Sequence, residues 1–235
     1  MSLISKSNII RFKNRKQAGI LLGEKLIHLV EKEPVVLAIP RGGVVVGREI
    51  AFRLNAELDL IITKKIGAPF NSELAIGSVA EDGSVYRNEE LIKRLDISEE
   101  YIKEEAMVQL RNIKERTKIF SKYRSCILPK GKTVIITDDG IATGATMISA
   151  INCIKMKEPK SIFVALPVGP AETIYELLKI VKSVICLMKP EYFMAVGEFY
   201  EEFCQISDLE VIDTLREFSE RKELSNKSRK HAFDV

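Results

Sequence analysis

Histidine, closely spaced cysteines and long apolar runs are scarce or missing in this chain of 235 residues. Its two histidines and four cysteines, none of them in a Cys-x-x-Cys pair, argue against a zinc site, which needs several such ligands at short spacing. We therefore expect the cysteines to be reduced and buried, as free thiols usually are in cytosolic proteins.

The chain also lacks the segments and the charge bias that would direct it to a membrane or to nucleic acid. It contains no run of about 18 apolar residues, so no membrane-spanning helix is expected. Residues 1–15 hold no apolar stretch of signal-peptide length, which favours a cytoplasmic protein. The 36 basic and 33 acidic residues leave a net charge of only +3, which argues against a dedicated nucleic-acid binder.

What the chain does contain is a regular alternation of apolar strands and helices, in a composition typical of soluble globular proteins. Short apolar runs, typical of strands buried on both faces, occupy residues 35–39, 58–63, 133–137, 161–166 and 183–188. Helices are predicted over residues 15–31, 44–54, 145–157, 170–179 and 208–220. This order predicts an α/β fold whose central, mostly parallel sheet has helices on both faces.

Residues 67–130 interrupt the alternation and are predicted to be an insertion, either a flap or a lid. A mobile loop is expected over residues 67–71, and a hairpin around Asp82-Gly83. A long charged helix should follow over residues 98–120, capped by Ser98. We expect one folded unit over residues 1–205, and a closing helix with a frayed polar tail over residues 206–235.

The most specific pattern follows the third predicted strand. Two acids, Asp138 and Asp139, leave the strand and are followed by small and hydroxyl residues, after which a helix begins. Ligands of parallel sheets bind beyond the carboxyl ends of the strands, where this loop lies. Backbone N–H groups at a helix start can hold a phosphate, and Gly144 lets the main chain approach it closely. Thr143 and Thr146 add hydroxyl donors, and the two acids can accept hydrogen bonds from vicinal ribose hydroxyls. The segment therefore predicts a site for a sugar phosphate.

The sequence Pro-Arg-Gly-Gly over residues 40–43 predicts another loop, which follows the first predicted strand. Arg41 supplies a fixed cation that can bind two phosphate oxygens at once, and Gly42 and Gly43 expose backbone N–H groups beside it. The spacing of these glycines does not match the Gly-x-Gly-x-x-Gly pattern of dinucleotide-binding loops. A pyrophosphate is therefore the ligand that this loop fits.

The run VIITDDGIATGAT over residues 134–146 resembles the signature with which type I phosphoribosyltransferases bind 5-phosphoribosyl 1-pyrophosphate (PRPP). The loop over residues 40–43 stands where that family has its pyrophosphate loop, which often contains a non-proline cis peptide. The resemblance covers about residues 35–203 and is closest to a subgroup with a Pro-Arg-Gly-Gly loop and no assigned acceptor. It implies a Mg²⁺-dependent, homodimeric transferase that moves the phosphoribosyl group of PRPP to a nitrogen acceptor, such as a nucleobase, and releases pyrophosphate.

The resemblance also implies roles for named residues. Asp138 and Asp139 would orient the ribose, directly or through water on Mg²⁺, and Arg41 with either Lys64 or Lys65 would stabilise charge on the departing pyrophosphate. The remaining substrate-binding residues are expected in the two loops and in a hood over residues 190–205, and they are Gly42, Gly43, Gly140, Ile141, Ala142, Thr143, Gly144, Ala145, Thr146, Tyr192 and Phe193.

The family usually has a mobile loop at the start of the insertion, which closes over the reaction and excludes water. By this resemblance Glu73, Glu81 and Arg87 are candidate loop-borne groups, with plain surface charge as the alternative for each.

The acceptor stays open, because two signals conflict. Ala142 stands where 6-oxopurine enzymes of the family carry an aspartate, and adenine and uracil enzymes carry alanine there. The spacing of Pro190, Phe193 and Gly197 is nevertheless similar to the hoods of 6-oxopurine enzymes. A non-catalytic regulator that binds PRPP is the alternative function, whereas a hydrolase is disfavoured because no Gly-x-Ser-x-Gly sequence is present.

Overall fold

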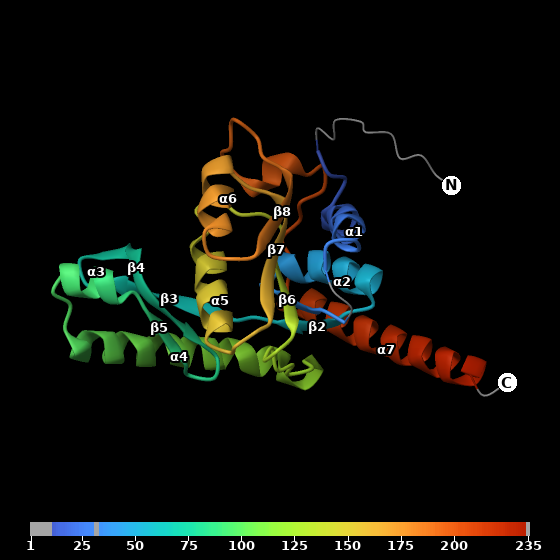
Figure 1. The fold of residues 1–235 in the computed structure, drawn as a ribbon, viewed down its shortest axis with the longest axis horizontal. Coiled ribbons are helices and arrows are strands. Elements are labelled where there is room, and N and C mark those ends of the chain that lie inside the picture. Colours follow the sequence, from blue (N-terminus) through green and yellow to red (C-terminus); the bar gives the residue numbers. More distant parts are fainter. Residues whose placement is uncertain (1–10, 31–32, 234–235) are drawn as a thin grey trace.

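The computed structural model describes residues 11–30 and 33–233, and all side chains among them except those of residues 73 and 223–233. Within this part of the chain lies a parallel sheet of five strands in the order β2-β1-β6-β7-β8 (Figure 1). Its strands are β1 (Val35–Ala38), β2 (Glu57–Leu60), β6 (Thr133–Thr137), β7 (Ser161–Val168) and β8 (Ser183–Met188). The predicted parallel sheet is confirmed, and β1 and β6 are buried along their whole length.

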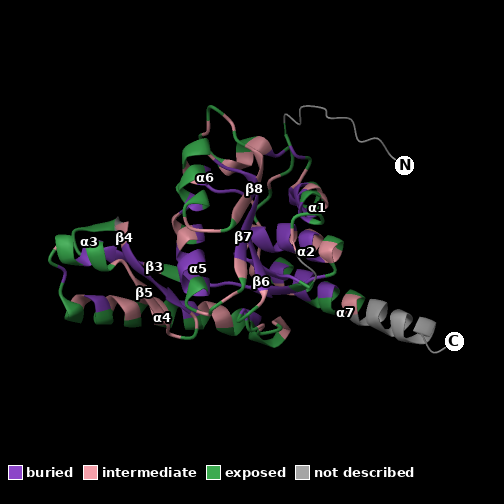
Figure 2. Cartoon of the chain, in the orientation of Figure 1, coloured by how far each residue is buried: buried purple, intermediate pink, exposed green. Residues whose placement is uncertain are grey.

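Helices cover both faces of this sheet, as predicted. One face carries α1 (Arg15–Leu26), α2 (Gly42–Leu54) and α7 (Asp208–Phe233), and the other carries α5 (Ala145–Lys155) and α6 (Ala171–Leu178) (Figure 1). Because side chains alternate along a strand, Val36 and Ile135 pack with the first group and Leu37 and Ile136 with the second. Figure 2 shows the buried residues concentrated in the strands and in the helix faces against them.

The insertion between β2 and β6 is a folded unit beside the main sheet. It contains an antiparallel sheet in the order β3-β4-β5 and two helices. Its elements are β3 (Thr63–Ala68), β4 (Asn71–Ala80), β5 (Val85–Arg87), α3 (Glu89–Arg94), α4 (Glu99–Phe120) and the 3-10 turn η1 (Ser121–Tyr123). The predicted hairpin at Asp82-Gly83 is confirmed, and so is the cap, because Ser98 accepts a hydrogen bond from the N–H of Tyr101. Strands β3 and β4 pack against α5, which fixes the insertion close to the helix that follows β6.

The predicted mobile loop over residues 67–71 is wrong. Strand β3 runs to Ala68 and β4 begins at Asn71, so a tight turn joins them. A Cβ on Gly67 would lie 2.7 Å from the Cα of Ser72, so the two strands approach more closely there than a side chain allows. The glycine that suggested a loop is therefore the residue that lets the hairpin close.

Other predicted boundaries of helices and strands differ from those in the structure. The run expected to be one strand over residues 58–63 is divided between the end of β2 and the start of β3. Helix α1 ends at Leu26, whereas α7 continues to Phe233, through most of the tail predicted to be frayed. Residues 234–235 lie outside the described residues.

The cysteines differ in how far they are buried. Cys153 is buried as predicted, but Cys126 and Cys204 are exposed, and the prediction of buried thiols is wrong for them. None of the helices in residues 11–30 and 33–233 is long and apolar enough to cross a lipid bilayer.

Candidate functional site

The first loop, residues 39–41 after β1, and the second or acidic loop, residues 138–144 after β6, touch each other at the carboxyl edge of the sheet. The two strands pair in parallel, so both loops leave the same edge. A Cβ on Gly42 would lie 1.9 Å from Oδ2 of Asp139, and a Cβ on Gly43 would lie 2.8 Å from the Cα of Asp138. The close approach therefore requires glycine at both positions. The peptide between Pro40 and Arg41 is cis, as the family resemblance implied.

The two acids of the second loop have different surroundings. Asp138 lines a large cavity of about 890 Å³, and its Oδ1 accepts a hydrogen bond of 2.8 Å from the N–H of Asp139. Burial, together with the neighbouring charge of Asp139, raises the pKa of Asp138 well above its usual value. Asp139 is instead paired with a cation, because Nε of Arg15 donates to its Oδ2 at 2.7 Å.

The remainder of the second loop forms an open turn ahead of α5. Ile141 fixes it to the sheet, because its side chain is buried and its N–H donates to the carbonyl of Val168 at 3.0 Å. Ala142, Thr143 and Thr146 are exposed beyond that anchor. Gly144 caps α5 with a φ of +73°, a conformation that favours glycine. The first turn of α5 therefore opens toward the cavity, with Thr146 in its lining.

Gly140 fits closely beneath the hood. Its φ is +152°, and a Cβ there would lie 2.5 Å from Cγ1 of Val196. Val196 begins the 3-10 turn η2 (Val196–Phe199), so the loop after β6 and the hood are in contact at this glycine.

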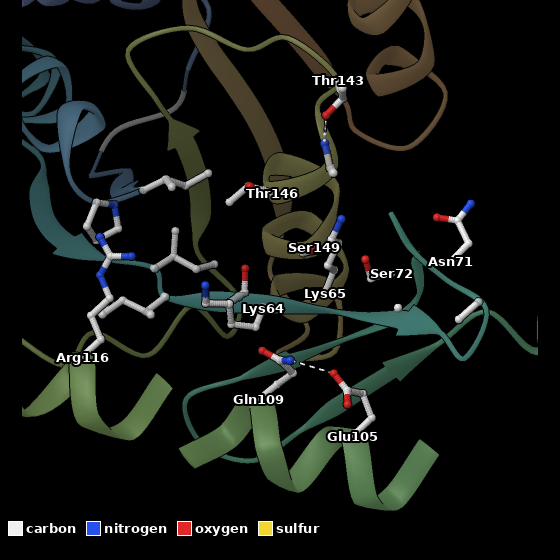
Figure 3. A pocket seen from close by; sticks show the side chains of 18 of the residues that line it. Lys64, Lys65, Asn71, Ser72, Glu105, Gln109, Arg116, Thr143, Thr146 and Ser149 are labelled. Atoms are coloured by element: carbon white, nitrogen blue, oxygen red, sulfur yellow. Dashed lines mark hydrogen bonds between the residues drawn. The ribbon is translucent and has the colours of Figure 1, made fainter. Parts of the chain in front are cut away.

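The cavity beside Asp138 has a volume of about 890 Å³ and lies between the edge of the main sheet and the insertion. The sheet side contributes Thr143, Thr146 and Ser149 from the second loop and α5. The insertion side contributes Lys64 and Lys65 of β3, and Glu105, Gln109 and Arg116 of α4 (Figure 3). Both predicted lysines therefore reach the cavity, and the structure does not choose between them.

Sequence reasoning missed the contribution of α4. Glu105, Gln109 and Arg116 are spaced by four and seven residues, which places them on one face of a helix, and this signal could have found them. Figure 3 shows all three rising from α4 toward Lys64. Nε2 of Gln109 donates to Oε1 of Glu105 at 2.7 Å, whereas Arg116 has no hydrogen-bond or ion-pair partner among the described residues.

Two of the three groups expected on a mobile loop, Glu81 and Arg87, make ion pairs within the fold. Glu81 is hydrogen-bonded to Arg124, which is buried and also donates to Asp59 of β2 at 2.8 Å. Arg87 pairs with Glu99 at the start of α4. Neither Glu81 nor Arg87 lines the large cavity, and the side chain of Glu73 lies outside the described residues.

The hood reaches the acidic loop through aromatics other than the predicted ones. Tyr192 is 84% exposed, and Phe193 stacks on Phe199 with ring centroids 5.4 Å apart, so neither lines the large cavity. The hydroxyl of Tyr200, in contrast, donates to the carbonyl of Asp139 at 2.6 Å. Its pKa is raised, by burial first and then by the charge of Asp139. A role for Tyr192 and Phe193 stays a prediction.

A smaller cavity of about 310 Å³ is lined by Asp139 and lies between the first loop and the hood. Arg15 and Arg41 line it together with Phe203 of the hood. Arg15 comes from the start of α1, and nothing in the local sequence signals that it contacts the acidic loop 124 residues later.

Comparison with known proteins agrees with this arrangement. A family model described as "Phosphoribosyl transferase domain" matches residues 7–201. Over 213 residues the chain is 36% identical to proteins named "Putative phosphoribosyl transferase" from two strains of Mycobacterium tuberculosis. The match covers 89% of this chain and 48% of theirs, so the chain spans about half the length of these curated relatives. The solved structure of TT1426 from Thermus thermophilus has a TM-score of 0.85 and 37% identity, over 88% of this chain and 99% of that one. The predicted fold class is thereby confirmed.

Proposed function

Because this chain belongs to the phosphoribosyl transferase domain family, we propose that it is an enzyme that transfers the phosphoribosyl group of PRPP to a nitrogen acceptor. The observation that carries the proposal is the contact between the loops after β1 and β6, which brings Arg41 and the acids Asp138 and Asp139 to one edge of the sheet. The adjacent cavity of about 890 Å³ has the size of a site for a nucleotide-sized ligand.

The phosphoribosyl end of PRPP fits the loop ahead of α5. Backbone N–H groups and the helix dipole at the start of α5 favour a phosphate there, and the exposed hydroxyls of Thr143 and Thr146 can donate to it. With the 5-phosphate in this place, the ribose hydroxyls would lie toward Asp138 and Asp139, whose carboxylates can only accept hydrogen bonds when ionised. This assignment gives each polar group of the loop a partner on the sugar.

The pyrophosphate end fits between the first loop and the insertion. Arg41 is the N-cap of α2 and lines the smaller cavity beside Asp139, whereas Lys64, Lys65 and Arg116 bring cations to the large cavity from the insertion. Negative charge grows on the pyrophosphate as it departs, and fixed cations in a partly enclosed cavity stabilise that charge more than water does. Arg116 adds a cation that sequence analysis had not assigned.

A magnesium ion could enter this site bound to the substrate. Within residues 11–30 and 33–233 no cluster of three or more His, Cys, Asp or Glu side chains could hold a metal. Asp138 and Asp139 are nevertheless consecutive carboxylates, the first in the lining of the large cavity and the second in that of the smaller one. Mg²⁺ prefers oxygen ligands and often keeps water and substrate phosphates among them. These two acids could hold it through water, and the ion would neutralise pyrophosphate charge.

In the proposed reaction the bond between C1 of the ribose and the pyrophosphate oxygen breaks, and its electron pair leaves with the pyrophosphate. A nitrogen of the acceptor forms the new bond to C1 and releases its proton. The ribose carries positive charge as the bond breaks, so the nearby carboxylates favour that state. The insertion covers one side of the cavity with β3 and α4, which limits the access of water to the reactive carbon.

The test is release of pyrophosphate from PRPP and Mg²⁺ in the presence of a panel of nucleobases. We expect turnover with one acceptor, and its loss in the double variant Asp138→Asn, Asp139→Asn, which keeps the size of both side chains. Asp213→Asn serves as a matched control, because Asp213 is exposed on α7 and pairs only locally with Arg216. Turnover in the double variant at the wild-type rate would falsify the proposal.

The same experiment separates the enzyme from the alternative regulator. Tight binding of PRPP without release of pyrophosphate for any acceptor would favour a regulator, whereas release names the acceptor. The homodimer implied by the family resemblance stays a prediction, and sedimentation of the purified chain measures it. The cytoplasmic location, expected from the sequence of residues 1–15, also stays a prediction.

A further inference from the structure

Arg15 joins three segments that are far apart in the sequence. Its guanidinium donates from Nε to Oδ2 of Asp139 at 2.7 Å and from Nη1 to the carbonyl of Cys204 at 2.8 Å. The same guanidinium lies 3.8 Å from the centre of the Phe203 ring. Its residue is only 7% exposed, so these are buried contacts between α1, the acidic loop and the hood.

The surroundings of Asp139 are built around this contact. A Cβ on Gly42 would lie 1.9 Å from Oδ2 of Asp139 and 2.9 Å from Nε of Arg15, so the pair fills the space beside the first loop. The main chain of Asp139 is held as well, by the hydrogen bond from the hydroxyl of Tyr200. Asp139 is therefore fixed at both its carboxylate and its backbone.

We propose that Arg15 is a positioning residue for sugar recognition, which holds the Asp139 carboxylate in place and links it to the hood. The inference rests on the proposed function, since it concerns how the same site recognises ribose. Arg15 occupies one carboxylate oxygen, Oδ2, and leaves Oδ1 able to accept a hydrogen bond from a ribose hydroxyl. Nη1 and the ring contact fix the guanidinium to residues 203–204. Arg15 therefore holds the Asp139 carboxylate and the hood at the same time.

The charge balance favours this role. The groups that face the pair are Asp138 on the same loop, Arg41 at the start of α2, Tyr200 of the hood and Glu210 at the start of α7. Two adjacent carboxylates repel each other, and Arg15 opposes the rise in the pKa of Asp138 that burial and Asp139 cause. Without Arg15, Asp139 would lose its fixed orientation.

A residue that only supports the fold would make the same contacts, so the test needs a readout specific to the sugar. We suggest calorimetric titration of the full chain with ribose 5-phosphate and with its 2-deoxy and 3-deoxy analogues, each of which lacks one hydroxyl. Wild type should bind ribose 5-phosphate more tightly than at least one analogue. In Arg15→Gln the affinity for ribose 5-phosphate should fall about tenfold, while that for the discriminated analogue should change little.

Two further variants complete the design. Lys16→Gln makes the same charge change at the neighbouring, exposed position of α1 and should keep the wild-type preference. Arg15→Lys keeps the charge but offers its donors from a single nitrogen instead of a planar fork, so its preference should be intermediate. If Arg15→Gln does not fold, the same titrations are made with Arg15→Lys, and its preference decides the test.

Each result is decisive. An Arg15 variant that keeps the wild-type preference, or that loses affinity equally for all three sugars, would overturn the inference while leaving the proposed function standing. A wild-type chain that binds neither ribose 5-phosphate nor PRPP would overturn both.

Discussion

The two walls of the large cavity are built in different ways. On the sheet side, the loops after β1 and β6 are fixed by buried strands and by glycines that admit no side chain. On the insertion side, the wall includes long polar side chains that project from β3 and α4. Such side chains retain rotamer freedom, whereas the backbone of the loops does not. Under the proposed function, the sheet side would recognise the sugar phosphate, and the insertion side would adjust to the negative charge that develops on the departing pyrophosphate.

The largest effect should come from filling the contact between the two loops. In Gly42→Ala the new methyl group would displace Asp139 and Arg15, so PRPP binding should weaken by more than about a hundredfold, the scale expected when a site shifts by about 1 Å. Titration with PRPP and Mg²⁺ measures the change. Gly131→Ala is the control, because Gly131 has a φ of +70° but nothing within 4 Å of an added Cβ. It should lose about 1 kcal/mol of stability and no affinity.

Wild-type affinity in Gly42→Ala would contradict the rigid sheet side, because the contact that distinguishes the two walls would then have no consequence for the ligand. Equal losses of affinity in Gly42→Ala and Gly131→Ala would trace the effect to general destabilisation.

The sheet side is also the part that sequence could predict. Apolar runs identified β1 and β6, and the loops after them could be recognised because Arg-Gly-Gly and Asp-Asp are short patterns of consecutive residues. Arg15 could not be predicted in this way, because its partner lies 124 residues away and only the folded chain brings them together.

The hood and the insertion show a second limit of local signals. An aromatic stretch was recognised in the hood, but the direction of the backbone decides that Tyr200, and not Tyr192, reaches the acidic loop. Likewise Glu81 and Arg87 look like free charges in the sequence and find their partners only in the fold.

A smaller effect is expected on the insertion side. Arg116→Gln removes a cation from the cavity, so the affinity for inorganic pyrophosphate should fall about tenfold, the scale of one charge-assisted contact. The affinity for ribose 5-phosphate, which lacks the pyrophosphate, should stay as in wild type. Titration with both ligands measures the split.

Arg111→Gln is the matched control, since Arg111 is exposed on the same helix and does not line the cavity. Equal losses for both ligands in Arg116→Gln would remove the proposed division of labour between the two walls. An unchanged affinity of Arg116→Gln for pyrophosphate would show that Arg116 does not contribute to binding it and that Lys64 and Lys65 are sufficient on the insertion side.

The smallest effect concerns the stability of the sheet side itself. Because the pKa of Asp138 is raised in the folded state, the fold favours the protonated acid. That contribution is fully present at pH below the unfolded pKa, and it is lost as the pH rises through the raised pKa, so at neutral pH the charged form makes the fold less stable. Asp138→Asn keeps an oxygen to accept the N–H of Asp139 and removes the charge. It should therefore raise the free energy of unfolding by about 1 kcal/mol at pH 7, even though it weakens PRPP binding.

Urea denaturation over a range of pH tests this expectation. The advantage of Asp138→Asn should shrink as the pH falls toward the ordinary value for an aspartate, because Asp138 then becomes protonated in wild type as well. Asp139→Asn should behave in the opposite way and lower the free energy of unfolding, because it leaves Arg15 buried beside a weaker partner. If Asp138→Asn were less stable than wild type at every pH, the acid would be a structural anchor of the loop. The sheet side would then owe its rigidity to Asp138 as much as to its glycines.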